Sequence, residues 1–148
     1  MDNLGKILQF RNGRKRPITI GDFPVYGGNG ILGYANDFNM QKGIIIGRVG
    51  AYCGSVFLSE TECWVSDNAI MALPLDDSDF LFSYYLLKWL ELNKRHIGTG
   101  QPLITQEILN RIEVDLPTPD KREKIGSILY CLDKRIQNNS AINDNLAA

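Results

Sequence analysis

The first half of the chain alternates short apolar runs with glycine-rich turns, a pattern that predicts a β-rich unit. Residues 43–50 contain three adjacent isoleucines, which predict a strand covered on both of its faces. Residues 54–58 are its expected hairpin partner. Further short strands are expected near residues 24–26, 31–34, 63–65 and 69–73.

The apolar period then changes, and the sequence predicts helices. A helix is expected from Asp77 or Ser78, as its cap, to about Leu92. It is apolar almost all round, so we expect it to be largely buried. A short helix capped by Thr105 is expected over residues 105–109, followed by a strand over residues 112–116.

The longest predicted element is a C-terminal helix from Lys121 to about Leu146. Asp120, three residues before Glu123, forms a carboxylate version of the capping box. At 1.5 Å per residue this helix would be roughly 39 Å long. One of its faces carries a heptad stripe that is first apolar and then polar. This seam comprises Ile125, Leu129, Leu132, Ile136, Asn139 and Asn143.

The sequence alone allows two interpretations of the seam. One is packing of the helix against its own domain. The other, which we favour, is a dimerisation surface for a partner helix, because a helix of this length extends beyond so small a domain. Polar residues on such a seam set register and oligomeric state.

Length and composition fit one domain plus a projecting element. The chain has 148 residues, 44% of them apolar, without a run near the roughly 20 apolar residues that span a bilayer. Its start lacks a secretory segment and its three cysteines fit no zinc pattern, so we expect a reduced, cytoplasmic protein.

We predict an α+β fold. Residues 1–118 form a twisted, mostly antiparallel, β-rich domain with a packed helix, and residues 119–148 form a long coiled-coil-forming helix.

The net charge of −1 hides an uneven distribution. Residues 1–48 hold seven Lys or Arg and three acids, whereas residues 49–87 hold six acids and no base. Local basic clusters matter more for phosphate contact than the mean charge does. The alternative is that these charges simply cover a solvated surface.

The sequence contains no recognisable catalytic apparatus. Residues 28–33 match G-x-G-x-x-G literally, but a β-like piece follows them instead of a helix, so no dinucleotide site is expected. There is no Walker A sequence, and His96 is the single histidine. No metal-ligand spacing is present either. We therefore predict a non-catalytic binding module, with a nuclease that uses unidentified acids as the less favoured alternative.

Three glycine-bracketed segments carry side chains suited to base recognition, namely residues 26–30, 47–52 and 98–101. Asn and Gln pair with adenine through two hydrogen bonds, and Arg pairs in the same way with guanine. Glycine allows the backbone to approach phosphate closely. The alternative is that these segments are only tight turns around a twisted sheet.

Six segments follow one another in a distinctive order within residues 17–140. They are Pro24–Tyr34, Ile45–Gly50, Ser66–Ala69, Gly98–Ile104, Ile112–Pro117 and the apolar part of the seam. In this order they resemble the target-recognition domain of a type I restriction-modification specificity subunit, followed by its spacer helix.

The resemblance implies a DNA-binding subunit that has no catalytic activity and no cofactor of its own. The implied partners are double-stranded DNA, a methyltransferase subunit and, for restriction, a translocase-nuclease subunit. The methyltransferase would bring S-adenosylmethionine and methylate adenine N6. The strongest alternative is an interaction module, an adaptor or inhibitor, that acts through the C-terminal helix without reading DNA.

Full-length members of that family carry two recognition domains and two spacers, whereas this chain has one of each. We therefore expect a half-subunit that forms a homodimer through residues 121–146. The alternatives are that the chain is a fragment of a longer protein, or that it pairs with another specificity chain.

The candidate DNA contacts are chosen by residue type and by location in the sequence. Base-contact candidates are Tyr26, Asn29, Arg48, Tyr52, Thr99 and Gln101. Phosphate candidates are Arg14, Lys15, Arg16, Lys42, Lys94 and Arg95.

Overall fold

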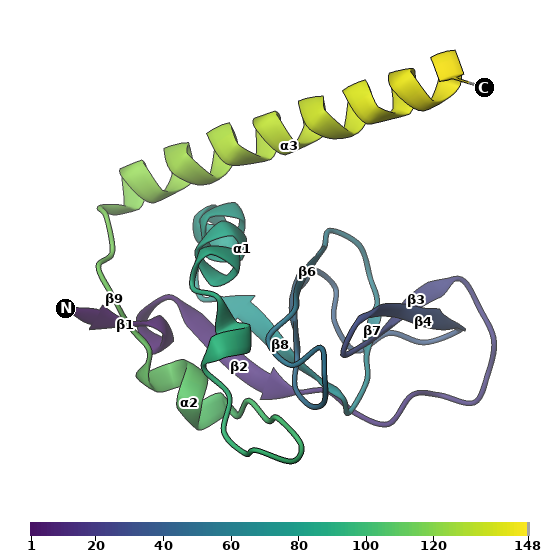
Figure 1. Ribbon diagram of the computed structural model, residues 1–148, viewed down its shortest axis with the longest axis horizontal. Coiled ribbons are helices and arrows are strands. Elements are labelled where there is room, and N and C mark those ends of the chain that lie inside the picture. The colour runs from purple at the N-terminus through teal and green to yellow at the C-terminus, as the bar shows by residue number, and fades with distance from the viewer. Residues whose placement is uncertain (148) are drawn as a thin grey trace.

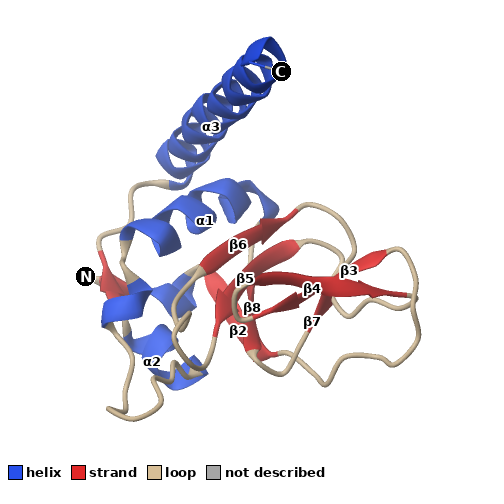
Figure 2. Cartoon of the chain, turned by 45° about the vertical axis from the view of Figure 1, so that its right-hand side comes forward, coloured by secondary structure: helices blue, strands red, loops and turns tan. Residues whose placement is uncertain are grey.

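A four-stranded antiparallel sheet lies at the centre of the molecule, in the order β2-β8-β5-β6 (Figures 1 and 2). The structure is a computed structural model that describes residues 1–147, so Ala148 of the expected C-terminal segment lies outside it. The strands are β2 (Leu8–Asn12), β5 (Gly43–Gly47), β6 (Val56–Ser59) and β8 (Ala69–Pro74). The predicted β5–β6 hairpin is confirmed, whereas β2 was not predicted.

Strand β5 is covered on both faces, as its three isoleucines predicted. Ile44 and Ile46 belong to the larger core cluster, together with α1 and α2 residues such as Leu87 and Leu109. Ile45 belongs to a second cluster on the opposite face, which includes Val65 and Met71. All five residues of β5 are buried. Apolar groups thus surround this strand on both sides, and burial of this kind is the main stabilising term of the fold.

A second sheet has the order β4-β3-β7 and packs beside the first. β3 (Phe23–Gly27) pairs antiparallel with β4 (Gly30–Ala35) and parallel with the short β7 (Trp64–Val65). Two further strands, β1 (Asp2–Asn3) and β9 (Glu113–Val114), join the N-terminus to the segment before the last helix. The predicted α+β class with mostly antiparallel pairing is confirmed.

The helices begin close to the predicted places, with one change of cap. Asp76, not Asp77 or Ser78, caps the first helical segment, because its carboxylate accepts from the Ser78 backbone N–H at 2.9 Å. The cap of the short helix is as predicted, since the Thr105 hydroxyl accepts from the Ile108 N–H at 3.2 Å. The segments are η1 (Leu4–Lys6), η2 (Asp77–Asp79), α1 (Phe80–Trp89), η3 (Leu92–Lys94) and α2 (Gln106–Arg111).

The long C-terminal helix is α3 (Pro119–Ala147). The prediction that Asp120 caps it was wrong. The Arg122 N–H donates to the Thr118 carbonyl at 3.0 Å, which places Pro119 in the first turn, where proline is favoured. α3 crosses α1 and continues past it, away from the rest of the chain (Figure 1). No helix within residues 1–147 is both long and apolar enough to cross a membrane.

Candidate nucleic-acid interface

Several loops meet at one end of the central sheet, where β2 and β5 end and β6 and β8 begin. The strand register shows this, since Gly47 lies opposite Ala69 and Ile46 lies opposite both Ile70 and Val56. We call this region the loop end. It comprises residues 27–30, 48–54, 66–68 and 97–103.

Arg48 ties these loops together. Its backbone N–H donates to the Asn68 carbonyl at 3.0 Å, and its own carbonyl accepts from the Ile104 N–H at 2.9 Å. The guanidinium makes a third bond, from Nη1 to the Asp67 carbonyl at 3.2 Å. Because a guanidinium has five N–H donors, the half-buried Arg48 keeps donors available for a ligand.

The β3–β4 turn packs against the loop that contains Arg48. A Cβ atom added at Gly47 would lie 2.5 Å from the carbonyl oxygens of both Gly28 and Tyr52. Any other residue would push these backbones apart, so glycine is required here. The close approach brings the turn residue Asn29 beside Arg48 and Tyr52, with Asn29 and Tyr52 both exposed.

The segment that carries Thr99 and Gln101 reaches the same end. Ile97 and Leu103 exchange backbone hydrogen bonds of 2.9 and 3.0 Å, which closes the segment into a loop with exposed Thr99 and Gln101 at its tip. The Gly50 N–H then donates to the Pro102 carbonyl at 3.0 Å. Five of the six base-contact candidates therefore lie at the loop end, although they are up to 72 positions apart in the sequence.

Most of the phosphate candidates border the loop end. The Arg14 N–H donates to the Val65 carbonyl at 3.0 Å, so the exposed basic segment Arg14–Arg16 leaves β2 next to residues 66–68. The backbone of Asn93 contacts Gly54, which places the exposed Lys94 and Arg95 beside the neighbouring loop.

Two predicted residues are not brought to the loop end. Tyr26 is half-buried between Phe57 and a cavity of about 500 Å³ that faces α3, and burial raises the pKa of its phenol. Lys42 precedes β5, so it lies at the opposite end of that strand from Arg48, about 20 Å away at roughly 3.4 Å per residue. Its Nζ is 4.5 Å from the centre of the Phe80 ring. Neither side chain therefore belongs to the surface formed by the loop end.

Two of the three cysteines, Cys53 and Cys63, are buried. Burial raises the pKa of the Cys53 and Cys63 thiols, which disfavours the reactive thiolate form. No group of three or more His, Cys, Asp or Glu side chains within residues 1–147 could hold a metal ion. The polar groups of the loop end are instead hydrogen-bond donors and acceptors, which suit recognition of base edges and phosphates.

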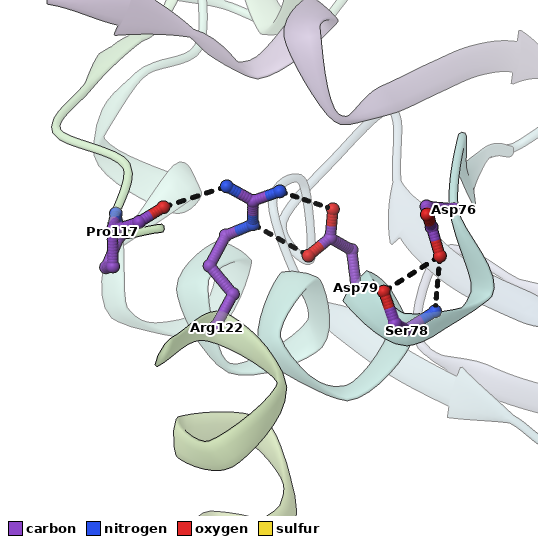
Figure 3. A network of polar contacts seen from close by, with 5 residues as sticks. All are labelled: Asp76, Ser78, Asp79, Pro117 and Arg122. Atoms are coloured by element: carbon purple, nitrogen blue, oxygen red, sulfur yellow. Dashed lines mark hydrogen bonds and ion pairs between the residues drawn. The ribbon is translucent and has the colours of Figure 1, made fainter. Parts of the chain in front are cut away.

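Sequence reasoning missed how α3 is attached to the domain. Arg122 donates from Nε and Nη2 to the two carboxylate oxygens of Asp79, at 2.7 and 3.0 Å, and from Nη1 to the Pro117 carbonyl at 2.8 Å (Figure 3). Farther along the helix, Gly126 is in close backbone contact with α1 at Phe82. No local pattern could reveal the contacts of Arg122 with Asp79 and of Gly126 with Phe82, because these partners are more than 40 positions apart.

The predicted seam does not take part in this attachment. Its apolar members Ile125, Leu129, Leu132 and Ile136 are between 37% and 62% exposed. Every described residue from Lys134 to Ala147 is exposed as well. The first half of α3 therefore packs against its own domain through Arg122, Gly126 and Asp133, as one interpretation expected. The seam stays partly open to solvent in the single chain, as the other interpretation expected.

Several known proteins are similar to this chain in sequence and in fold. Curated relatives include the type I restriction enzyme EcoprrI specificity subunit of Escherichia coli, which is 26% identical over 88% of this chain and 35% of its own length. Another is a putative type I specificity subunit of Mycoplasma pneumoniae, 26% identical over 89% of this chain and 44% of its own length. The chain thus spans less than half of these relatives.

Among solved structures, the type I restriction-modification S subunit from M. genitalium superposes with a TM-score of 0.81 at 21% identity, over 94% of this chain and 40% of that one. This likeness shows a shared fold. The family described as the type I restriction modification DNA specificity domain matches residues 3–148. The chain belongs to this family of DNA specificity domains.

Proposed function

We propose that this chain reads one half of a split DNA target and directs adenine N6 methylation by a partner methyltransferase subunit. The observation that carries the proposal is the convergence of Asn29, Arg48, Tyr52, Thr99 and Gln101 at the loop end. A basic segment, Arg14–Arg16, borders this surface. Phosphate contacts would position the domain on the duplex, and the polar side chains at the loop end would read base edges.

The chain would act as a half-subunit. The exposed seam on α3 supports pairing with a second copy, because a stripe of leucine and isoleucine side chains in water favours association. A two-fold pair would present two loop ends and read a symmetric split target. S-adenosylmethionine would be bound by the methyltransferase and not by this chain. A translocase-nuclease subunit would add restriction to the same complex.

Methylome sequencing in a methylation-free host tests the proposal. The host would express the chain together with the methyltransferase encoded beside it, and the methyltransferase alone would serve as the control. We expect N6-methyladenine at a symmetric split motif only when the chain is present. An asymmetric motif would contradict the homodimer, and no motif from a soluble complex would contradict DNA reading itself.

A further inference from the structure

Two hydrogen bonds join α3 to the recognition domain beyond the ion pair at its base. The Tyr85 hydroxyl on α1 donates to Asp133 Oδ2 on α3 at 2.6 Å. The Tyr130 hydroxyl on α3 donates to Glu60, just after β6, at 2.8 Å. Both bonds line the cavity of about 500 Å³ between α3 and the domain. We call these two bonds the tyrosine latch.

The latch lies at a separate point from the base of the helix. Arg122 and Asp133 are 11 residues apart, which corresponds to about 17 Å along α3. One attachment point leaves a helix free to pivot, whereas two separated points fix its direction. Gly126 lies between them, where the helix backbone touches α1, and acts as the natural pivot if the latch opens.

The two phenols remain hydrogen-bond donors at neutral pH. Burial is the largest cause of the raised pKa of Tyr85, and the hydrogen bond to Asp133 is the second. The hydrogen bond to Glu60 is the largest cause of the raised pKa of Tyr130, and burial is the second. Hydrogen bonds to a charged carboxylate are stronger than those between neutral groups, so each bond resists displacement of the helix.

We propose that the tyrosine latch fixes the direction of α3 relative to the loop end, and that it thereby sets the gap between half-sites that the paired specificity complex accepts. The inference rests on the proposed function. From the pivot at Gly126 to Leu146 the helix is a lever of about 30 Å, and every described residue after Asp133 is exposed. A tilt of about 6–7° would move its far end by about 3.4 Å, which is roughly one base-pair step.

The test uses the full chain in complex with the methyltransferase. The double variant Tyr85→Phe/Tyr130→Phe removes both latch hydroxyls and keeps both rings. Tyr84→Phe is the matched control, because Tyr84 also lies on α1 and borders the same cavity, but its hydroxyl contacts Lys88 of its own helix. Binding is measured on duplexes that carry the two half-sites found by methylome sequencing, with gaps varied by one base pair.

We expect the wild type and Tyr84→Phe to prefer one gap. The double variant should recognise the same bases in each half-site, while its preference for one gap over gaps one base pair longer or shorter falls at least about tenfold. An unchanged gap profile would overturn the proposal, as would a double variant that is folded by circular dichroism and binds no duplex. If the double variant does not fold, the single variants decide by the same criteria. Failure of the proposed function is distinguishable, because the wild type itself would then bind none of the duplexes.

Discussion

Arg122 on α3 and Asp79 in the turn before α1 form an ion pair with two hydrogen bonds, and their side chains are only 13% and 4% exposed. The pair joins the recognition domain to the helix that extends from it (Figure 3). A buried pair of this kind contributes little net stability when intact, but loss of one partner leaves an uncompensated charge. The main effect of the pair is therefore to hold α3 in one position relative to the recognition domain, and its net contribution to the stability of the fold is small.

Replacing Arg122 should strongly destabilise the chain. Arg122→Ala leaves the Asp79 carboxylate buried without a counter-charge, and we expect a loss of about 3 kcal/mol in the free energy of unfolding, measured by urea denaturation. Arg111→Ala is the control, because Arg111 pairs with Glu107 in a site where both side chains are more than two-thirds exposed. That variant should lose less than about 1 kcal/mol. Equal losses in the two variants would show that the buried pair has no special role.

Gly126 should tolerate no side chain. A Cβ atom at this position would lie 2.5 Å from the Phe82 backbone nitrogen, so Gly126→Ala must separate α3 from α1. We expect a net loss of about 1–3 kcal/mol from overpacking, despite the higher helix propensity of alanine. In Gly100→Ala, by contrast, the new Cβ meets no atom within 4 Å and stability should hardly change. Thermal unfolding followed by circular dichroism measures both, and a Gly126→Ala protein as stable as wild type would contradict the close crossing.

The seam should control self-association. Leu132→Glu together with Ile136→Glu would place like charges across a paired seam, so we expect the double variant to sediment as a monomer at concentrations where the wild type is a dimer. Asn138→Glu is the control, since Asn138 is equally exposed on α3 but lies off the seam. A wild type that is strictly monomeric at tens of micromolar would rule out the homodimer.

Variants of phosphate-contact residues and of base-contact residues should differ in how their DNA affinity depends on salt concentration. The logarithm of DNA affinity falls linearly with the logarithm of salt concentration, and Lys15→Ala should make this slope smaller by about 1 without changing the target sequence. Arg48→Ala should relax one target position at a cost of about 1–3 kcal/mol. Lys42→Ala serves as the control for charge, because Lys42 lies at the opposite end of β5 and should leave the slope unaltered. If Arg48→Ala retains both target choice and affinity, the loop end is not the reading surface.

The local elements of the fold could be predicted from the amino-acid pattern. The isoleucine run of β5, the turn glycines and the 3.6-residue period of α1 and α3 depend on which neighbours share a face of one strand or helix. For the same reason the seam on α3 was predictable as a stripe on one face, since its residues are three or four positions apart, whereas its exposure became clear only in the structure. Strand β2 was missed because its alternation of Leu8 and Phe10 is too short to stand out in a mixed N-terminal segment.

Contacts between residues far apart in the chain could not be predicted in this way, because they depend on how the elements pack together. Tyr130 and Glu60 are 70 positions apart, and Arg122 and Asp79 are 43 apart, so each contact exists only once α3 has crossed α1. The pairing of β5 with β6 and β8 placed Arg48 at the loop end and Lys42 away from it, although both flank β5. Periodicity reports the face of an element on which a residue lies. The end of the molecule at which it emerges depends on strand direction and sheet order, which arise from contacts between segments distant in the chain.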